Sequence, residues 1–339
     1  MQDVPISLNV LAVRFSSIGD VLLTTPLLRA IRRRYPDARI TVLTKPAYVS
    51  LLSHNPHVDR VLDAPPDRPL RLLARELRAG RYTHLLDLHD SLRSRLLRAM
   101  VPGPWSTYPK HRLARAALIY SKRDYYRHRR PLAERYFDAA RALQLTPDGE
   151  CPDFFVSPEA ERETEAWLTG TDLEQRPIIA LAPGAAHSTK RWPVEHWRLL
   201  AGRLLEQGFR LIVVGGTEDA RLGDALVSIM DGRIANAAGR FGLQGTGALL
   251  RRAAVLVSGD TGVMHMATAV KTPVVALFGP TVRPFGFFPY SQRAEVIELE
   301  LPCRPCSSKG GPRCPLGHHR CMLDIAPDLV HAAVNRSLG

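Results

Sequence analysis

Apolar and polar residues alternate in two ways along the first half of the chain. Short runs rich in Val, Ile and Leu predict buried strands, and apolar residues at helical spacing predict helices between them. The strand patterns cover residues 9–15, 39–44, 58–64 and 83–89, and the helical patterns cover 20–35, a short turn near Tyr48, and 70–79. This alternation predicts the α/β class, with a doubly covered parallel sheet.

The pattern becomes irregular in the middle of the chain and then restarts. Residues 102–130 predict loops, 131–145 predict a helix, and 146–160 indicate a linker through their Pro, Gly and Asp content. After Arg176, strand patterns cover 177–184, 209–216 and 273–280, a helical pattern covers 193–208, and 253–270 indicates strand, turn and helix. Two such units predict two Rossmann-like domains, 1–155 and 156–339, with a cleft between them.

The length of 339 residues agrees with about two domains. No apolar run approaches the roughly 18 to 20 residues that span a bilayer. The N-terminal residues lack the basic start and long apolar core of a signal peptide. We therefore expect a cytoplasmic protein.

The formal net charge of +13 is unevenly distributed. Between Arg68 and Arg135, basic residues outnumber acidic residues by roughly three to one, which predicts an anionic partner. Nucleic acid, an anionic membrane face and a phosphorylated substrate all fit, and a solvated Arg-rich surface is the alternative. Because no nucleic-acid-binding motif is recognisable, nucleic acid ranks last.

A turn of small residues, "SSIGD", joins the first strand to the first helix. It lies at the carboxyl edge of the predicted sheet, where α/β proteins bind ligands, and Ser16, Ser17 and Gly19 allow close approach. Asp20 either faces a ligand there or only caps the helix.

The stretch "SGDTGVMH" repeats this arrangement in the second half. A helix beginning near Thr261 offers free amides at Thr261 and Gly262, which favours an anion. His265 could face the same ligand. Alternatively, Asp260 and Thr261 only cap the helix and His265 packs.

In "APGAAHSTKRWP", Gly184 permits a tight turn, and Lys190 and Arg191 place cations where a diphosphate could lie. A solvent-exposed loop is the alternative. The chain has no P-loop motif, and no G-x-G-x-x-G follows the first strand. Glu218 could accept hydrogen bonds from a ribose, or it could lie in solvent.

Four cysteines close together near the C-terminus suit a tetrathiolate metal site. Cys303, Cys306, Cys314 and Cys321 are separated by two, seven and six residues. Zinc or iron would hold the segment together without a catalytic role. Free thiols or transient disulfides are the alternatives, and we expect Cys151 to be inert.

Together, "VRFSSIGDVLLTTPLLRAIRRRYPDARITVLT", "PGAAHSTKRWPVEHW", "VVGGTED" and "SGDTGVMHMATAVKTPVVALFGPT" resemble glycosyltransferase family 9, the ADP-heptose:lipopolysaccharide heptosyltransferases. The resemblance covers most of the chain in the same order. It implies the two-domain GT-B fold, with the acceptor in the first domain and the donor nucleotide in the second. It also implies a final helix that often crosses back toward the first domain.

The resemblance assigns roles to individual residues. Asp20 becomes the general base, Lys190 contacts the leaving diphosphate, and Ser16, Ser17 and Gly19 admit the acceptor. No catalytic metal is expected. The donor-binding residues are expected to be Gly184, Ser188, Thr189, Lys190, Glu218, Asp260, Thr261, Gly262 and His265.

The implied reaction is an inverting transfer of heptose from ADP-heptose to the lipopolysaccharide inner core. The acceptor is acidic and lipid-linked, so peripheral contact with the inner face of the inner membrane is expected, and nucleic acid is not. The cysteine segment, 303–321, departs from the best-known core enzymes and leaves another nucleotide sugar or acceptor open. A GT-B-like nucleotide-sugar epimerase or hydrolase, or a non-catalytic binder, is the alternative from a different class.

Overall fold

The computed structural model describes residues 8–171, 173, 176–228 and 233–339. The chain forms two compact units. The first runs to Lys110 and resumes over Leu132–Phe155, and the second comprises His111–Pro131 and Val156–Gly339. The sequence placed residues 111–131 in the first domain. The structure groups them with the second unit because Leu118 packs against Phe285.

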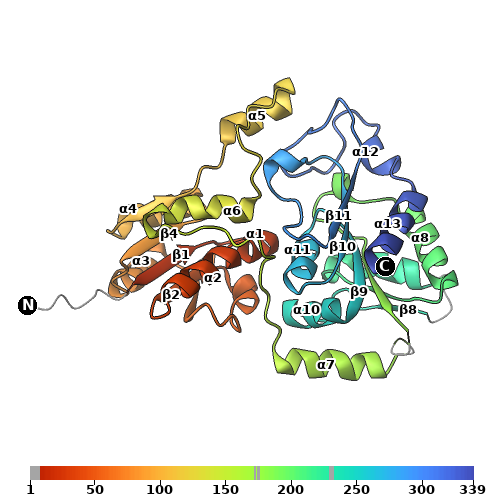
Figure 1. Cartoon of the computed structure of the whole chain (residues 1–339), viewed down its shortest axis with the longest axis horizontal. Coiled ribbons are helices and arrows are strands. Elements are labelled where there is room, and N and C mark those ends of the chain that lie inside the picture. Colours follow the sequence, from red (N-terminus) through yellow and green to blue (C-terminus); the bar gives the residue numbers. More distant parts are fainter. Residues whose placement is uncertain (1–7, 172, 174–175, 229–232) are drawn as a thin grey trace, which may run out of the picture. The chain divides into compact units, whose positions relative to one another are not determined.

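The first unit is built on a five-stranded parallel sheet in the order β3–β2–β1–β4–β5 (Figure 1). Central β1 pairs with β2 and β4, which aligns Val13 with Leu43 and Asp87. The ends of these strands therefore meet at one sheet edge. The strands are β1 (Asn9–Val13), β2 (Arg39–Thr44), β3 (Arg60–Asp63), β4 (His84–Asp87) and β5 (Trp105–Thr107). The helices are α1 (Ile18–Leu22), α2 (Thr25–Arg34), α3 (Leu70–Ala79), α4 (Leu92–Met100) and α6 (Leu132–Arg135), with 3₁₀ turns η1 (Pro46–Leu51) and η2 (Tyr136–Leu143).

The second unit contains a six-stranded parallel sheet in the order β11–β10–β9–β6–β7–β8. Its strands are β6 (Ile178–Ala182), β7 (Arg210–Val213), β8 (Ile234–Asn236), β9 (Ala253–Gly259), β10 (Val274–Phe278) and β11 (Ala294–Glu298). Its helices are α5 (Arg112–Ser121), α7 (Pro158–Thr169), α8 (Val194–Glu206), α9 (Ala220–Val227), α10 (Leu243–Arg252), α11 (Gly262–Ala269), α12 (Arg320–Leu323) and α13 (Pro327–Leu338). Its 3₁₀ turns are η3 (Ser188–Lys190), η4 (Thr217–Asp219) and η5 (Arg283–Phe285). Two parallel sheets confirm the predicted α/β class.

Three local predictions need correction. The single helix expected over 20–35 is two helices, because Pro26 has no N–H with which to continue α1 and sits in the first turn of α2. The irregular stretch 102–130 contains β5 and α5. The expected linker ends earlier than predicted, since Ser157 caps α7 by accepting a hydrogen bond from the Ala160 amide.

The last helix, α13, packs against α8 and against strands β9, β10 and β11. Its Val330, Ala333 and Val334 are fully buried. The resemblance implied a helix that often crosses back toward the first domain, whereas these contacts cover the sheet of the second unit.

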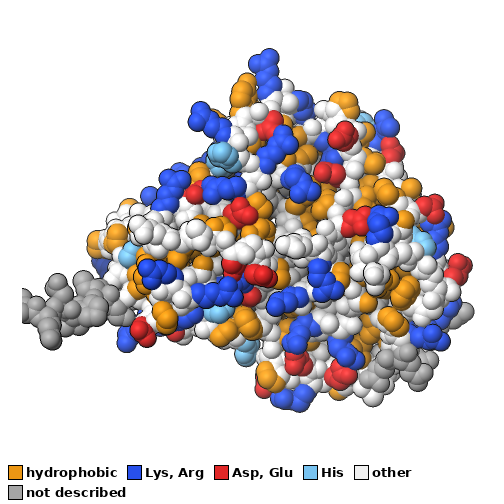
Figure 2. Space-filling view, in the orientation of Figure 1, with side chains coloured by type: hydrophobic (Ala, Val, Ile, Leu, Met, Phe, Trp, Pro, Cys, Tyr) orange, Lys and Arg blue, Asp and Glu red, His pale blue; other side chains and the backbone are white. Residues whose placement is uncertain are grey.

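Lys and Arg side chains are spread widely over the surface that Figure 2 shows. This distribution agrees with the net charge of +13. Within the described residues, no helix is both long and apolar enough to cross a membrane.

Candidate functional site

The Asp20 carboxylate lies in α1, directly beyond the carboxyl end of β1. Its Oδ2 accepts hydrogen bonds from the Ser17 amide at 3.0 Å and the Ser17 hydroxyl at 2.9 Å. Its Oδ1 lies 2.5 Å from a guanidinium nitrogen of Arg14. Asp20 therefore caps the helix start, and it also remains 17% exposed. Of the small residues predicted beside it, Ser17 is exposed, Ser16 is half-buried and Gly19 is buried.

Arg14 fixes the orientation of this carboxylate. It directly follows β1, is 6% exposed, and donates to the carbonyl oxygens of Ser16 at 2.8 Å and Leu88 at 2.6 Å. The guanidinium also lies 5.8 Å from the centre of the Tyr136 ring. Burial disfavours the charged carboxylate, but Arg14 and the Ser17 hydrogen bonds outweigh it, so the pKa of Asp20 is below its usual value. Asp20 is therefore ionised at neutral pH.

Three further polar residues follow neighbouring strands at the same sheet edge. Lys45 follows β2, His89 closely follows β4, and Lys110 closely follows β5. The Lys110 ammonium donates to the carbonyl oxygens of His89 and Asp90. Sequence reasoning missed these three residues, although their positions just after strands are readable in the sequence.

His89 is neutral in this setting. Burial and the cations of Arg14, Lys110 and Lys45 lower the pKa of His89 to about 4. Within the described part of the chain, its buried Nδ1 has no hydrogen-bond partner. A buried polar atom of this kind is costly unless something bonds to it, so His89 is suited to contact a bound polar group.

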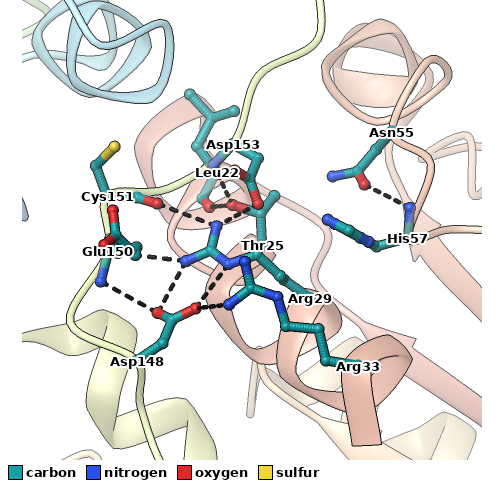
Figure 3. A network of polar contacts seen from close by, with 10 residues as sticks. All are labelled: Leu22, Thr25, Arg29, Arg33, Asn55, His57, Asp148, Glu150, Cys151 and Asp153. Carbon is teal, nitrogen blue, oxygen red and sulfur yellow. Dashed lines mark hydrogen bonds and ion pairs between the residues drawn. The ribbon is translucent and has the colours of Figure 1, made fainter. Parts of the chain in front are cut away.

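A network of polar contacts around Arg29 ties α2 to the segment that follows η2 (Figure 3). Arg29 is 4% exposed, lies 2.8 Å from an Asp148 oxygen, and also pairs with Asp153. The Asp153 amide donates to the Thr25 hydroxyl at 2.7 Å. The segment that follows η2 is thereby fixed to the helix after α1.

In the second unit, the predicted phosphate-contacting lysine pairs with an aspartate. The Lys190 ammonium lies 2.6 Å from Asp260 Oδ2, and the two side chains are 12% and 9% exposed. The same oxygen accepts a hydrogen bond from the Thr281 hydroxyl at 2.7 Å. Asp260 therefore orients Lys190 at the carboxyl end of β9.

The start of α11 matches the sequence prediction. Thr261 is the N-cap, and its hydroxyl accepts from the Met264 amide at 3.4 Å and contacts the Ser258 hydroxyl at 3.0 Å. Gly262 is the first helical residue, in the turn where amides lack helical partners. His265 is only 4% exposed, so it packs inside the unit.

The remaining predicted donor residues are in different surroundings. A Cβ on Gly184 would lie 1.8 Å from a carboxylate oxygen of Asp219. The sequence analysis did not identify Asp219. Ser188 and Glu218 are exposed. Thr189 is 4% exposed, and its hydroxyl bonds the backbone of Gly311, so it anchors the cysteine segment.

The four late cysteines carry free thiols. Burial, followed by the neighbouring cysteines, raises the pKa of Cys321 to about 11 and also raises the pKa of Cys306. However, among the described residues no group of three or more His, Cys, Asp or Glu side chains is arranged to hold a metal ion.

Comparisons with known proteins agree on one family. The sequence model of glycosyltransferase family 9 (heptosyltransferase) matches residues 70–315. Lipopolysaccharide heptosyltransferase 2 of Escherichia coli (strain K12) is 28% identical, over 98% of this chain and 99% of that protein. The structure of E. coli ADP-heptose lps heptosyltransferase II superposes with a TM-score of 0.78 at 26% identity, covering 98% of each chain. The family 9 glycosyl transferase of Veillonella parvula DSM 2008 superposes with a TM-score of 0.83 at 24% identity, covering 97% of each chain.

Proposed function

Because the chain belongs to glycosyltransferase family 9 (heptosyltransferase) and has the GT-B fold expected of that family, we propose that it transfers heptose from ADP-heptose to the lipopolysaccharide inner core. The observation that carries this proposal is the ionised Asp20, held at a sheet edge by Arg14 and Ser17. The names of the relatives support the donor and the acceptor.

We assign Asp20 the role of general base. A carboxylate has about four acceptor positions, and Arg14 and the two Ser17 donors occupy three, so the remaining one is on Oδ1. The acceptor hydroxyl would give its proton to that oxygen while its own oxygen bonds the anomeric carbon. The bond from that carbon to the diphosphate breaks on the opposite face, which inverts the configuration. A positioned base contributes about 10²- to 10⁴-fold to the rate.

The donor diphosphate would bind where Lys190 meets the start of α11. Its departing charge is stabilised by the ammonium group and by the Thr261 and Gly262 region. Lys190 already pairs with Asp260, so the diphosphate would share or take over that contact. Asp260, whose Oδ2 also accepts a hydrogen bond from the Thr281 hydroxyl, keeps the ammonium in position before the diphosphate binds.

The acceptor would be held by the basic groups beside Asp20. Lys45, His89 and Lys110 follow three strands of one sheet edge, and Arg14 lies at the end of a fourth. An acidic sugar or phosphate matches the cations of Lys45, Lys110 and Arg14, and the neutral His89 offers a further polar contact through its open Nδ1. A lipid-linked acceptor of this kind implies work at a membrane surface facing the cytoplasm.

The deciding experiment compares the native protein with Asp20→Asn in transfer from ADP-heptose to a heptose-deficient lipopolysaccharide. Asp67→Asn, at an exposed position, is the matched control. We expect Asp20→Asn to keep ADP binding and to lose about 10²- to 10⁴-fold in rate. Near-native transfer by Asp20→Asn would refute the base assignment. Release of ADP at full rate without acceptor would favour an epimerase or hydrolase, and ADP binding without transfer would point to another sugar or acceptor.

For the cysteine segment we propose a structural zinc or iron ion bound by Cys303, Cys306, Cys314 and Cys321. The spacing of the four cysteines in the sequence supports this, although among the described residues no group of three or more His, Cys, Asp or Glu side chains is arranged to hold a metal ion. Metal binding would have to displace thiol protons and move the segment. Metal analysis of the native protein, beside a Cys303→Ser/Cys306→Ser variant and a Cys151→Ser control, tests it. A metal-free native protein would reject the proposal.

A further inference from the structure

We propose that residues His111–Pro131, here called the α5 segment, dock the protein on the surface of an anionic lipid bilayer. The inference rests on the proposed function, in that a lipid-linked acceptor requires the enzyme to work at a membrane. It adds the surface that makes the contact.

One side of the α5 segment is firmly attached. Leu118 and Tyr126 are buried against Phe285, and the Arg115 guanidinium lies 5.3 Å from the centre of the Phe285 ring. Lys122 donates to backbone oxygens of the cysteine segment, at 2.9 Å to Cys303 and 2.6 Å to Pro305. The opposite, exposed side of the α5 segment therefore belongs to an element that is held in place by packing and hydrogen bonds.

The other side carries apolar side chains in solvent. Leu113 and Tyr120 are each 87% exposed, the highest values among the large apolar side chains of the described residues. They are seven residues apart, so they lie two turns apart on one face of α5, opposite the buried Leu118. Tyr125, just after the helix, is 58% exposed. These side chains can insert into the interfacial region of a bilayer without any unfolding of the α5 segment.

Basic residues surround this apolar face. The α5 segment contains seven Lys or Arg residues and one acidic residue, Asp124. Exposed members include Arg112, Arg123 and Arg127. Figure 2 has the same orientation as Figure 1, and at the position where Figure 1 labels α5 it shows basic side chains next to hydrophobic ones. Each basic residue close to an anionic leaflet strengthens binding about fivefold at physiological salt.

The combination favours a bilayer over a soluble polyanion. Basic residues alone would suit nucleic acid or free phosphate equally well. Exposed Leu and Tyr gain from binding only if they leave water, and a basic surface with apolar side chains is the pattern of interfacial elements. An anionic lipid surface can interact with both the basic and the apolar side chains of the α5 segment.

The first test is sedimentation of the full-length protein with vesicles. Native protein should bind phosphatidylcholine vesicles containing phosphatidylglycerol, bind pure phosphatidylcholine weakly, and release in high salt. Leu113→Ser/Tyr120→Ser should bind the anionic vesicles at least about tenfold more weakly. The control is Leu199→Ser, which removes a 54% exposed leucine from α8. Unchanged thermal unfolding should show that each variant is folded.

The second test separates docking from transfer. Leu113→Ser/Tyr120→Ser should transfer poorly to acceptor embedded in anionic vesicles and normally to a deacylated, soluble acceptor. The docking proposal is wrong if native protein does not bind anionic vesicles, or if the double variant binds them as tightly as native protein does. Either result leaves the proposed reaction unaffected. Equal binding to duplex DNA, independent of Leu113 and Tyr120, also overturns the docking proposal. Vesicle binding as expected without transfer to either acceptor supports docking and overturns the proposed reaction.

Discussion

Replacing Arg14 with methionine removes the guanidinium that neutralises and orients the Asp20 carboxylate. In the native protein the side chains of Arg14 and Asp20 are only 8% and 17% exposed, so solvent screens this pair little. Removing one partner of a buried ion pair typically costs about 3–5 kcal/mol. Because Asp20 keeps its two hydrogen bonds from Ser17, we expect the free energy of unfolding to fall by about 3 kcal/mol at pH 7.

The pH dependence of this loss has a definite sign. In the native protein the pKa of Asp20 is below its unfolded value, so the pair stabilises the fold above that unfolded value, and the stabilisation is lost as pH falls through the folded pKa. Without Arg14, burial is the main remaining influence and raises the pKa of Asp20. The variant should therefore lose more stability at pH 7 than at acidic pH.

Catalysis should respond in two ways. The acid limb of kcat/KM should move to higher pH, because Asp20 protonates more easily, and kcat at its plateau should fall about 100-fold through lost orientation. Arg14→Lys keeps the positive charge but loses the guanidinium hydrogen bonds to the carbonyl oxygens of Ser16 and Leu88. It should therefore lower kcat, while the acid limb of kcat/KM should move less than in Arg14→Met. ADP release measured across pH gives both quantities. An unmoved acid limb in folded Arg14→Met would refute the reasoning.

Three other changes probe separate parts of the molecule. Lys190→Met should weaken ADP binding about 10- to 100-fold in calorimetry, by removing a charge-assisted contact; native affinity would contradict its donor role. Gly184→Ala should lower stability by about 1–3 kcal/mol, because the new Cβ would lie 1.8 Å from a carboxylate oxygen, whereas Gly216→Ala has open space and should be nearly neutral. Arg29→Met should cost about 3–5 kcal/mol in denaturant unfolding, against under about 1 for Arg33→Met, which is 61% exposed; equal losses would remove the special role of the buried network.

The sequence predicted what is local. Both sheets follow from alternating strand and helix patterns, and the Thr261 cap and the position of Asp20 after β1 follow from turn chemistry. The division of the helix at Pro26 was also readable, because proline interrupts a helix. These features depend on a few adjacent residues.

What the sequence did not predict depends on residues far apart in the chain. Lys45, His89 and Lys110 share an edge only because β2, β4 and β5 occupy one sheet in a particular order. Arg14 looked like part of a strand, and its role appears only beside Asp20 and Leu88. The α5 helix was missed because its apolar residues point both toward the packed side and into solvent, which obscures a helical period.

The path of the chain limits how this enzyme can be recombined with its relatives. The backbone passes from one unit to the other after Lys110, Pro131 and Phe155. A chimera joined only at residue 155 would pair an inherited α5 with a foreign η5, and Leu118 would meet a surface that did not evolve with it. Exchange of the second unit therefore requires residues 111–131 to be transferred together with residues 156–339. The boundary between the units follows three-dimensional packing and is discontinuous in the gene.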